Sequence, residues 1–200
     1  MLRDRARLIS TVESAISLQK KHGIPSAGIH HGWAEVMAGN FEQGIRRMRD
    51  GLAAFRRLRP GDETMKISSL IFIADAHLQA RQRIEEGLSA VMEIIAVMAK
   101  TGERWCEPEA YRLKGELLLA GPKSNQTQVE ACFANAISIA QEQSAKLSEL
   151  RAGTSLARLR HSQGRHAEAR DTLAPIYGWF TEDLELPDLK DARALLEELT

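Results

Sequence analysis

The fold is decided by two neighbouring stretches of sequence, residues 105–120 (WCEPEAYRLKGELLLA) and residues 129–140 (VEACFANAISIA). In both stretches apolar residues recur every three or four positions, which is the period of one helix face. Gly121 and Pro122 follow the first stretch and favour a helix end and a turn. The two stretches therefore predict a pair of antiparallel helices joined by a turn over residues 121–126.

The rest of the chain repeats this unit of about 40 residues. Helix pairs are expected at about 26–59, 62–101, 103–144 and 147–181, after a half-unit at 2–22 and before a capping helix at 187–199. No stretch alternates apolar and polar residues over the length of a strand, so we expect an all-α fold in a single domain over residues 1–200. The half-unit has no partner helix before it, which suggests a piece of a longer protein.

Small residues occupy similar places in the pairs. They lie seven and five positions apart in two of the pairs, and a third pair has one at the first place: Gly32, Gly39 and Gly44; Ala157, Gly164 and Ala169; Gly115. Small residues let two helices approach closely, and a large apolar neighbour then fills the remaining space. One pair cannot bury both of its faces, so we expect the pairs to stack into a solenoid. The pattern resembles the tetratricopeptide repeat (TPR), with longer loops and fewer aromatic residues, and we expect a TPR-like α-α superhelix.

Composition narrows the possible functions. The 200 residues include 27 Lys and Arg and 27 Asp and Glu, and this zero net charge argues against a dedicated nucleic-acid binder. No apolar run approaches the ~18 residues that indicate a membrane span, so no membrane contact is expected. The two cysteines, Cys106 and Cys132, lie within helical patterns. We expect them to be buried, reduced thiols in a cytoplasmic protein.

Several motifs give a closer resemblance over residues 28–199. They are residues 33–39, 76–78, 101–105, 111–119, 130–133, 154–159 and 173–182. Together they resemble the C-terminal helical region of bacterial multidomain proteins that join a class III adenylate or guanylate cyclase domain, or a DNA-binding domain, to a STAND-type ATPase and TPR-like repeats. The resemblance implies a sensor or interaction arm. The catalytic motifs of that family belong to other domains and have no counterpart in this chain.

A group of arginines is the clearest candidate for partner binding. Arg46, Arg49, Arg56 and Arg57 fall within one arc of the helix expected over 41–58, because successive helix residues are about 100° apart. Such a stripe can bind an anion, a nucleic-acid backbone or an acidic partner segment. With Glu42 and Asp50 nearby, a solvated helix face is the alternative that we favour.

The first helix of each pair usually lines the concave groove of such a solenoid. This placement makes five polar residues candidates for partner binding: Glu35, Arg112, Glu116, Arg158 and His161. Tyr177, Trp179 and Phe180 form an aromatic cluster, which fits either a partner hot spot or a core under the capping helix. We favour the core for this cluster, and also for Trp33 and Trp105.

No catalytic, cofactor or metal site is expected. Neither cysteine has a His and Asn or Asp pair placed to activate it. His30 and His31 point about 100° apart on one helix, His161 and His166 straddle a turn, and no Cys or carboxylate completes a tetrahedral metal site. We therefore expect a non-catalytic scaffold that binds a protein or peptide, or a second copy as a homodimer. The alternative is a regulatory domain that binds a small molecule in the groove.

Overall fold

The computed structural model describes residues 27–122, 124–182 and 185–200, and all of its regular elements in these ranges are α-helices. The helices are α2 (Ala27–Met37), α3 (Phe41–Leu58), α4 (Glu63–Ala80), α5 (Ile84–Thr101), α6 (Glu107–Ala120), α7 (Gln126–Glu142), α8 (Lys146–Ser162), α9 (His166–Tyr177) and α10 (Pro187–Glu198). The helix expected over residues 2–22 lies outside the described residues. The described helices coincide with the four expected pairs and the last expected helix to within a few residues.

Two helices differ most from their expected bounds, and local chemistry explains both. α7 begins three residues before the predicted start because Asn125 caps it, its side-chain oxygen accepting a hydrogen bond from the Gln128 N–H at 3.3 Å. α9 ends at Tyr177, four residues before residue 181, where the fourth pair was expected to end. Pro175, two residues before that end, has no N–H for a helical hydrogen bond, and this favours early termination.

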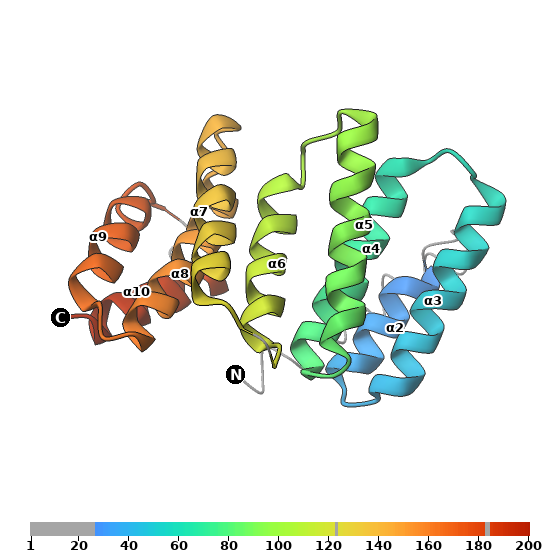
Figure 1. Cartoon of the computed structure of the whole chain (residues 1–200), viewed down its shortest axis with the longest axis horizontal. Helices are drawn as coiled ribbons and strands as arrows, with labels where there is room; N and C mark the ends of the chain where they lie inside the picture. Colours follow the sequence, from blue (N-terminus) through green and yellow to red (C-terminus); the bar gives the residue numbers. More distant parts are fainter. Residues whose placement is uncertain (1–26, 123, 183–184) are drawn as a thin grey trace. The chain divides into compact units, whose positions relative to one another are not determined.

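The chain divides between Glu103 and Arg104 into two compact units. Unit 1 contains the pairs α2–α3 and α4–α5, and unit 2 contains the pairs α6–α7 and α8–α9 followed by α10 (Figure 1). Within each unit the first helix of a pair packs against both helices of the preceding pair, as α4 does on α2 and α3 and as α8 does on α6 and α7. α10 packs on α8 and α9 in the same way, so it occupies the place of a first helix.

The predicted close approach of paired helices is confirmed for α2 and α3. A Cβ atom on Gly32 would lie 2.4 Å from the Gly44 carbonyl oxygen, and one on Gly44 would lie 2.4 Å from the Gly32 carbonyl oxygen. Met48 fills the adjacent space and is fully buried. Gly39 has a different role, since it adopts a φ of 97° in the turn between these helices, a conformation that glycine adopts readily.

The third pair places a large side chain against a small one. A Cβ atom on Gly115 of α6 would lie 2.5 Å from Cε1 of Phe133 on α7. The Phe133 ring is fully buried and belongs to a core cluster with Val129, Leu156 and Leu159. This cluster joins α7 to α8, and therefore joins the two pairs of unit 2.

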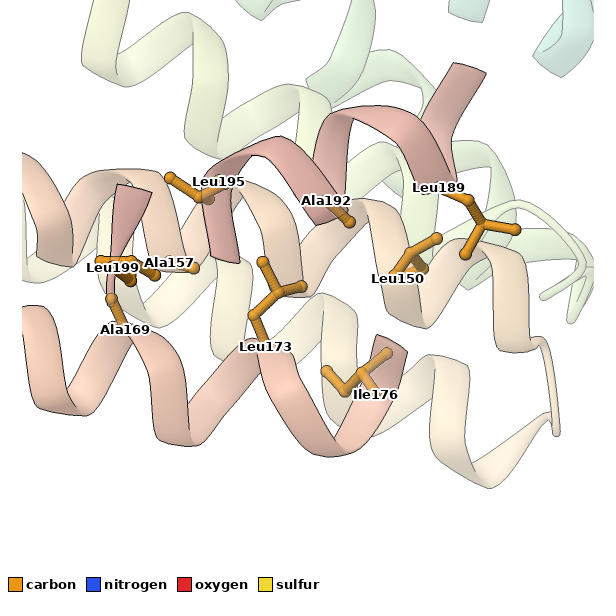
Figure 2. Packing of buried hydrophobic residues seen from close by; sticks show 9 residues of the cluster. All are labelled: Leu150, Ala157, Ala169, Leu173, Ile176, Leu189, Ala192, Leu195 and Leu199. Carbon is orange, nitrogen blue, oxygen red and sulfur yellow. The ribbon is translucent and has the colours of Figure 1, made fainter. Parts of the chain in front are cut away.

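The last core cluster of unit 2 joins α8, α9 and α10. Figure 2 shows its nine buried residues, which are Leu150, Ala157, Ala169, Leu173, Ile176, Leu189, Ala192, Leu195 and Leu199. The predicted small residues Ala157 and Ala169 both lie in it and are fully buried. α10 contributes three of the nine side chains and its C-cap residue Leu199 a fourth, and together they cover the apolar face of the last pair.

Charged side chains connect α7, α8 and α9 on the second-helix side of unit 2. Glu130 accepts hydrogen bonds from Arg160 at 2.8 Å and from Arg165 at 3.0 Å, and Arg165 also binds Glu168 at 2.5 Å. Hydrogen bonds from Arg165, and then from Arg160, hold the pKa of the Glu130 carboxyl below its ordinary value of 4.5, although partial burial opposes this shift. The ionised carboxylate therefore stabilises the folded state.

Replacing Glu130 with glutamine is expected to lower the free energy of unfolding by about 1–2 kcal/mol at pH 7, because hydrogen bonds between charged groups are lost. Because the folded pKa is depressed, this contribution is present above the unfolded pKa of about 4.5 and disappears as the pH falls through the folded pKa. Urea unfolding of the parent chain and of Glu130→Gln between pH 7 and about pH 3 should show that the difference in their free energies of unfolding becomes smaller in acid. Glu198→Gln, an exposed change on α10, is the control. A difference that stays constant with pH would contradict the stabilising role of the carboxylate.

Candidate interaction surfaces

Three charged residues lie on one face of α6 in unit 2. Glu109, Arg112 and Glu116 are spaced by three and four residues, so they share a helix face. Arg112 is paired with Glu109 at 2.7 Å and with Glu116 at 3.8 Å. All three side chains are half-buried, and these ion pairs hold them in place on the first helix of the pair.

This charged face continues across α8 to α10. The Ser155 hydroxyl donates to Glu116 at 2.6 Å, and Arg151 and Arg158 on α8 pair with Asp188 and Asp191 on α10 at 2.9 and 2.5 Å. The Asp188 hydrogen bond raises the pKa of the Arg151 guanidinium, which favours its charged form. We call this charged array the polar ladder; its members are Glu109, Arg112, Glu116, Arg151, Ser155, Arg158, Asp188 and Asp191, of which Ser155 is buried.

The polar ladder includes three of the five groove residues expected from the sequence, namely Arg112, Glu116 and Arg158. Its other members were not predicted, because the sequence does not show which residues of α8 and α10 face each other. A usable signal was present in the spacing of Arg151, Ser155 and Arg158, which are four and three residues apart and therefore share one face of a helix.

The other two groove candidates face second helices. Glu35 on α2 accepts from Arg47 at 2.9 Å and from Gln43 at 3.1 Å, and both of these residues lie on α3. His161 lies in the last turn of α8, where its Nδ1 is 2.8 Å from Nδ1 of His166 on α9. Neither residue belongs to the polar ladder as defined above, and their role in partner binding stays a prediction.

In unit 1, the first helices α2 and α4 meet through aromatic rings. Phe72 makes edge-to-face contacts with His30 and Trp33 at centroid distances of 4.9 and 6.0 Å. The Trp33 indole N–H donates to Asp75 at 2.7 Å. Burial lowers the pKa of His30, which favours its neutral form. Trp33 is therefore partly buried between α2 and α4, and its indole N–H forms a hydrogen bond. The sequence predicted only that it packs in the core.

The four arginines of the expected stripe are all exposed on α3. Arg49 is ion-paired with Glu86, and Arg56 with Glu93 at 2.8 Å, so two of the four bind carboxylates of α5 within unit 1. Arg46 lines a cavity of about 190 Å³ together with Arg49 and Arg83 and with the carboxylates of Glu42 and Asp50. These acidic neighbours fit the solvated helix face that we favour from the sequence.

Two tryptophans correct the sequence interpretation. Trp105 and Trp179 were expected in the core, but they are 51% and 59% exposed. Trp105 precedes α6 and Trp179 follows α9, so both lie beyond helix ends. Tyr177 and Phe180, the aromatic residues near Trp179 in the sequence, pack against the last core cluster as expected. Lys146 lies 5.7 Å from the Trp179 ring centroid, within cation–π distance.

Other expectations concern cavities, thiols and membranes. Three cavities among the described residues have volumes of about 190, 210 and 220 Å³, below the roughly 300–1,000 Å³ usual for small-molecule sites.

Both cysteines are buried free thiols as predicted, and burial raises the pKa of Cys132, which disfavours its reactive thiolate. In the part of the chain described, no helix has the length and apolar character needed to cross a membrane.

Comparisons with known proteins support the fold. No protein-family model matches the sequence, and no curated protein matches it. A solved structure described as a kinesin light chain with nearly identical TPR-like repeats, from Podosopora anserina, is 16% identical over 88% of this chain and 86% of its own, with a TM-score of 0.66. A substituted variant of that protein is also 16% identical, over 88% of this chain and 85% of its own, with a TM-score of 0.67. The chain therefore has the predicted all-α, TPR-like fold.

Proposed function

We propose that this chain is a non-catalytic TPR-like scaffold that binds an extended, polar segment of a partner protein on the polar ladder of unit 2. The observation that carries this proposal is the continuity of the ladder across α6, α8 and α10, through the Glu116–Ser155 hydrogen bond and the Arg151–Asp188 and Arg158–Asp191 ion pairs. A segment lying across these three helices would meet positively charged guanidinium donors and negatively charged carboxylate acceptors.

The internal contacts of the polar ladder favour binding in two ways. They hold long side chains in fixed positions, which lowers the conformational entropy that a partner must offset when it orders them. They also leave carboxylate and guanidinium groups exposed enough to form further hydrogen bonds, since Arg158 and Asp191 have exposed side chains. Charges of both signs select partners by complementarity and reject segments of one sign.

A larger context follows from the resemblance in sequence. We propose that the scaffold serves as the sensor or interaction arm of a signalling ATPase or cyclase, acting in the cytoplasm of a bacterium. The support is the set of motifs described above, together with buried cysteines that form no disulfide. Self-association through the arginines of α3 has less support, because Arg49 and Arg56 already pair with carboxylates of α5.

The proposal is tested by selecting ligands from a displayed library of extended peptides. Peptides of about 12 residues are long enough, at ~3.3 Å per residue, to cross three helices spaced about 10 Å apart. A selected peptide should bind Arg112→Ala/Arg158→Ala about tenfold or more weakly than the unmodified chain. Arg57→Ala/Arg170→Ala removes two exposed arginines of α3 and α9, and it should bind normally.

Circular dichroism of each variant would show that its helices are intact. Equal affinity of the two double variants for the selected peptides would contradict the assignment to the polar ladder. Failure to select any peptide above background would contradict the scaffold function itself.

A further inference from the structure

The histidines at the turn between α8 and α9 face each other through the same ring nitrogen. His161 lies in the last turn of α8, and His166 is the first residue of α9. Their Nδ1 atoms are 2.8 Å apart, and their ring centroids are 4.7 Å apart. From this geometry we propose that His161 and His166 form a two-imidazole site for a divalent transition-metal ion such as Cu(II) or Ni(II).

The backbone of the turn fixes this approach. Gly164 has a φ of 75°, and its N–H donates to the His161 carbonyl at 2.9 Å. The Arg165 N–H donates to the Arg160 carbonyl, also at 2.9 Å. The chain therefore reverses within three residues and places the first residue of α9 opposite the last turn of α8. In the sequence this turn counted against a metal site, whereas in the structure it brings the two rings together.

The short separation requires a hydrogen between the two nitrogens. A neutral imidazole carries its proton on one nitrogen and has a lone pair on the other. At 2.8 Å one Nδ1–H must donate to the other Nδ1, because two lone pairs or two N–H groups would repel each other at this distance. When an ion binds, the donor ring shifts its proton from Nδ1 to Nε2, so that both rings stay neutral and both Nδ1 lone pairs can bind the ion.

The separation is compatible with two imidazoles on one ion. Metal–imidazole bonds of about 2.0 Å place two nitrogens about 2.8 Å apart at a right angle and about 3.3 Å apart at a tetrahedral angle. The observed 2.8 Å lies within about 0.5 Å of both distances, so ring rotations that aim both lone pairs at one ion can produce either arrangement. Imidazole ligands suit Cu(II), Ni(II) and Zn(II).

The surrounding charges permit a cation. Arg160 and Arg165 are the nearest basic residues in sequence, and both are paired with Glu130, while Arg165 also pairs with Glu168. Both rings reach solvent, so an ion could enter without unfolding the turn. Among the described residues no three His, Cys, Asp or Glu side chains are grouped to hold a metal. Water, or a donor group from a partner protein, would therefore complete the coordination.

The site adds to the scaffold function and does not depend on it. An ion bound to both rings would link the end of α8 to the start of α9 and stabilise the folded chain by mass action. Because protonation of either imidazole removes the lone pair that binds the ion, the affinity should fall as the pH is lowered.

The experiment is a Cu(II) titration of the untagged full chain, followed by calorimetry and by electron paramagnetic resonance. We expect one ion per chain, with hyperfine structure from two imidazole nitrogens and a rise in Tm. Losing a residue that only orients a metal ligand costs about 10–100-fold in affinity, so His161→Asn or His166→Asn should weaken binding by at least about tenfold.

His31→Asn removes a half-exposed histidine of α2 and is the matched control. It should bind Cu(II) as the unmodified chain does. The proposal is overturned if both α8–α9 variants bind Cu(II) as tightly as the unmodified chain, or if the spectrum shows a single nitrogen ligand. Because the two rings are on the surface, these variants should keep the helical circular dichroism of the parent.

Discussion

Gly32→Ala is expected to destabilise the chain by about 2 kcal/mol, although alanine is the better helix former. The added Cβ would lie 2.4 Å from the Gly44 carbonyl oxygen and 2.9 Å from the Met48 backbone nitrogen. These are backbone atoms, so α3 must move away, and such overpacking costs about 3 kcal/mol at the upper end of its usual range. The gain in helix propensity of about 1 kcal/mol offsets only part of this cost.

Gly28→Ala is the matched control, because it makes the same change on the same helix. A Cβ at Gly28 would meet its nearest neighbour, the Gly51 Cα, at 3.4 Å, which is an ordinary contact. This variant should therefore be as stable as the parent or up to about 1 kcal/mol more stable. Urea unfolding followed by circular dichroism measures both variants. Equal stabilities would mean that α2 and α3 do not approach as closely as described.

Phe133→Ala is expected to have the largest effect of any single change in unit 2. The ring is fully buried against Gly115 and in the cluster that joins α7 to α8. Removing a buried Phe ring costs about 3–5 kcal/mol, because apolar contacts are lost and a cavity remains. Leu119→Ala removes a side chain that is 39% exposed on α6 and should change stability by less than about 0.5 kcal/mol.

A double-mutant cycle can assign this effect to the contact between Phe133 and Gly115. In the parent chain a Cβ on Gly115 would lie 2.5 Å from Phe133 Cε1, so Gly115→Ala alone should destabilise. In the Phe133→Ala background the same Cβ enters the space that the ring has left. The double variant should therefore be more stable than the sum of the two single changes predicts. If the destabilisations of the two single changes simply add in the double variant, the Phe133 ring does not pack against Gly115.

The pairing of helices could be predicted because it depends on local sequence. Apolar periodicity marked every described helix, and the small residues Gly32, Gly44 and Gly115 marked the close contacts. Gly39 and Gly164 belonged to the same spacing pattern but serve the turns instead, with φ values of 97° and 75°. Spacing alone could not separate these roles, because glycine satisfies both a close contact and a positive φ.

The candidate surfaces were harder to predict because they depend on contacts between distant segments. The partners of Arg151 and Arg158 on α10 lie more than 30 residues away, and sequence spacing does not reveal which carboxylates they meet. Trp105 and Trp179 were misassigned to the core because aromatic residues in helical patterns usually pack. Both stand just outside a helix, where periodicity no longer indicates the buried side.

The scaffold function is tested most directly by mapping where a selected peptide binds. The measurement is the change in backbone amide chemical shifts of the ¹⁵N-labelled chain as the tightest selected peptide is added. We predict that the largest changes fall on α6, α8 and α10, around Arg112, Ser155 and Asp188. Changes concentrated on the second helices α7 and α9, or in unit 1, would contradict the proposal that the polar ladder receives the partner.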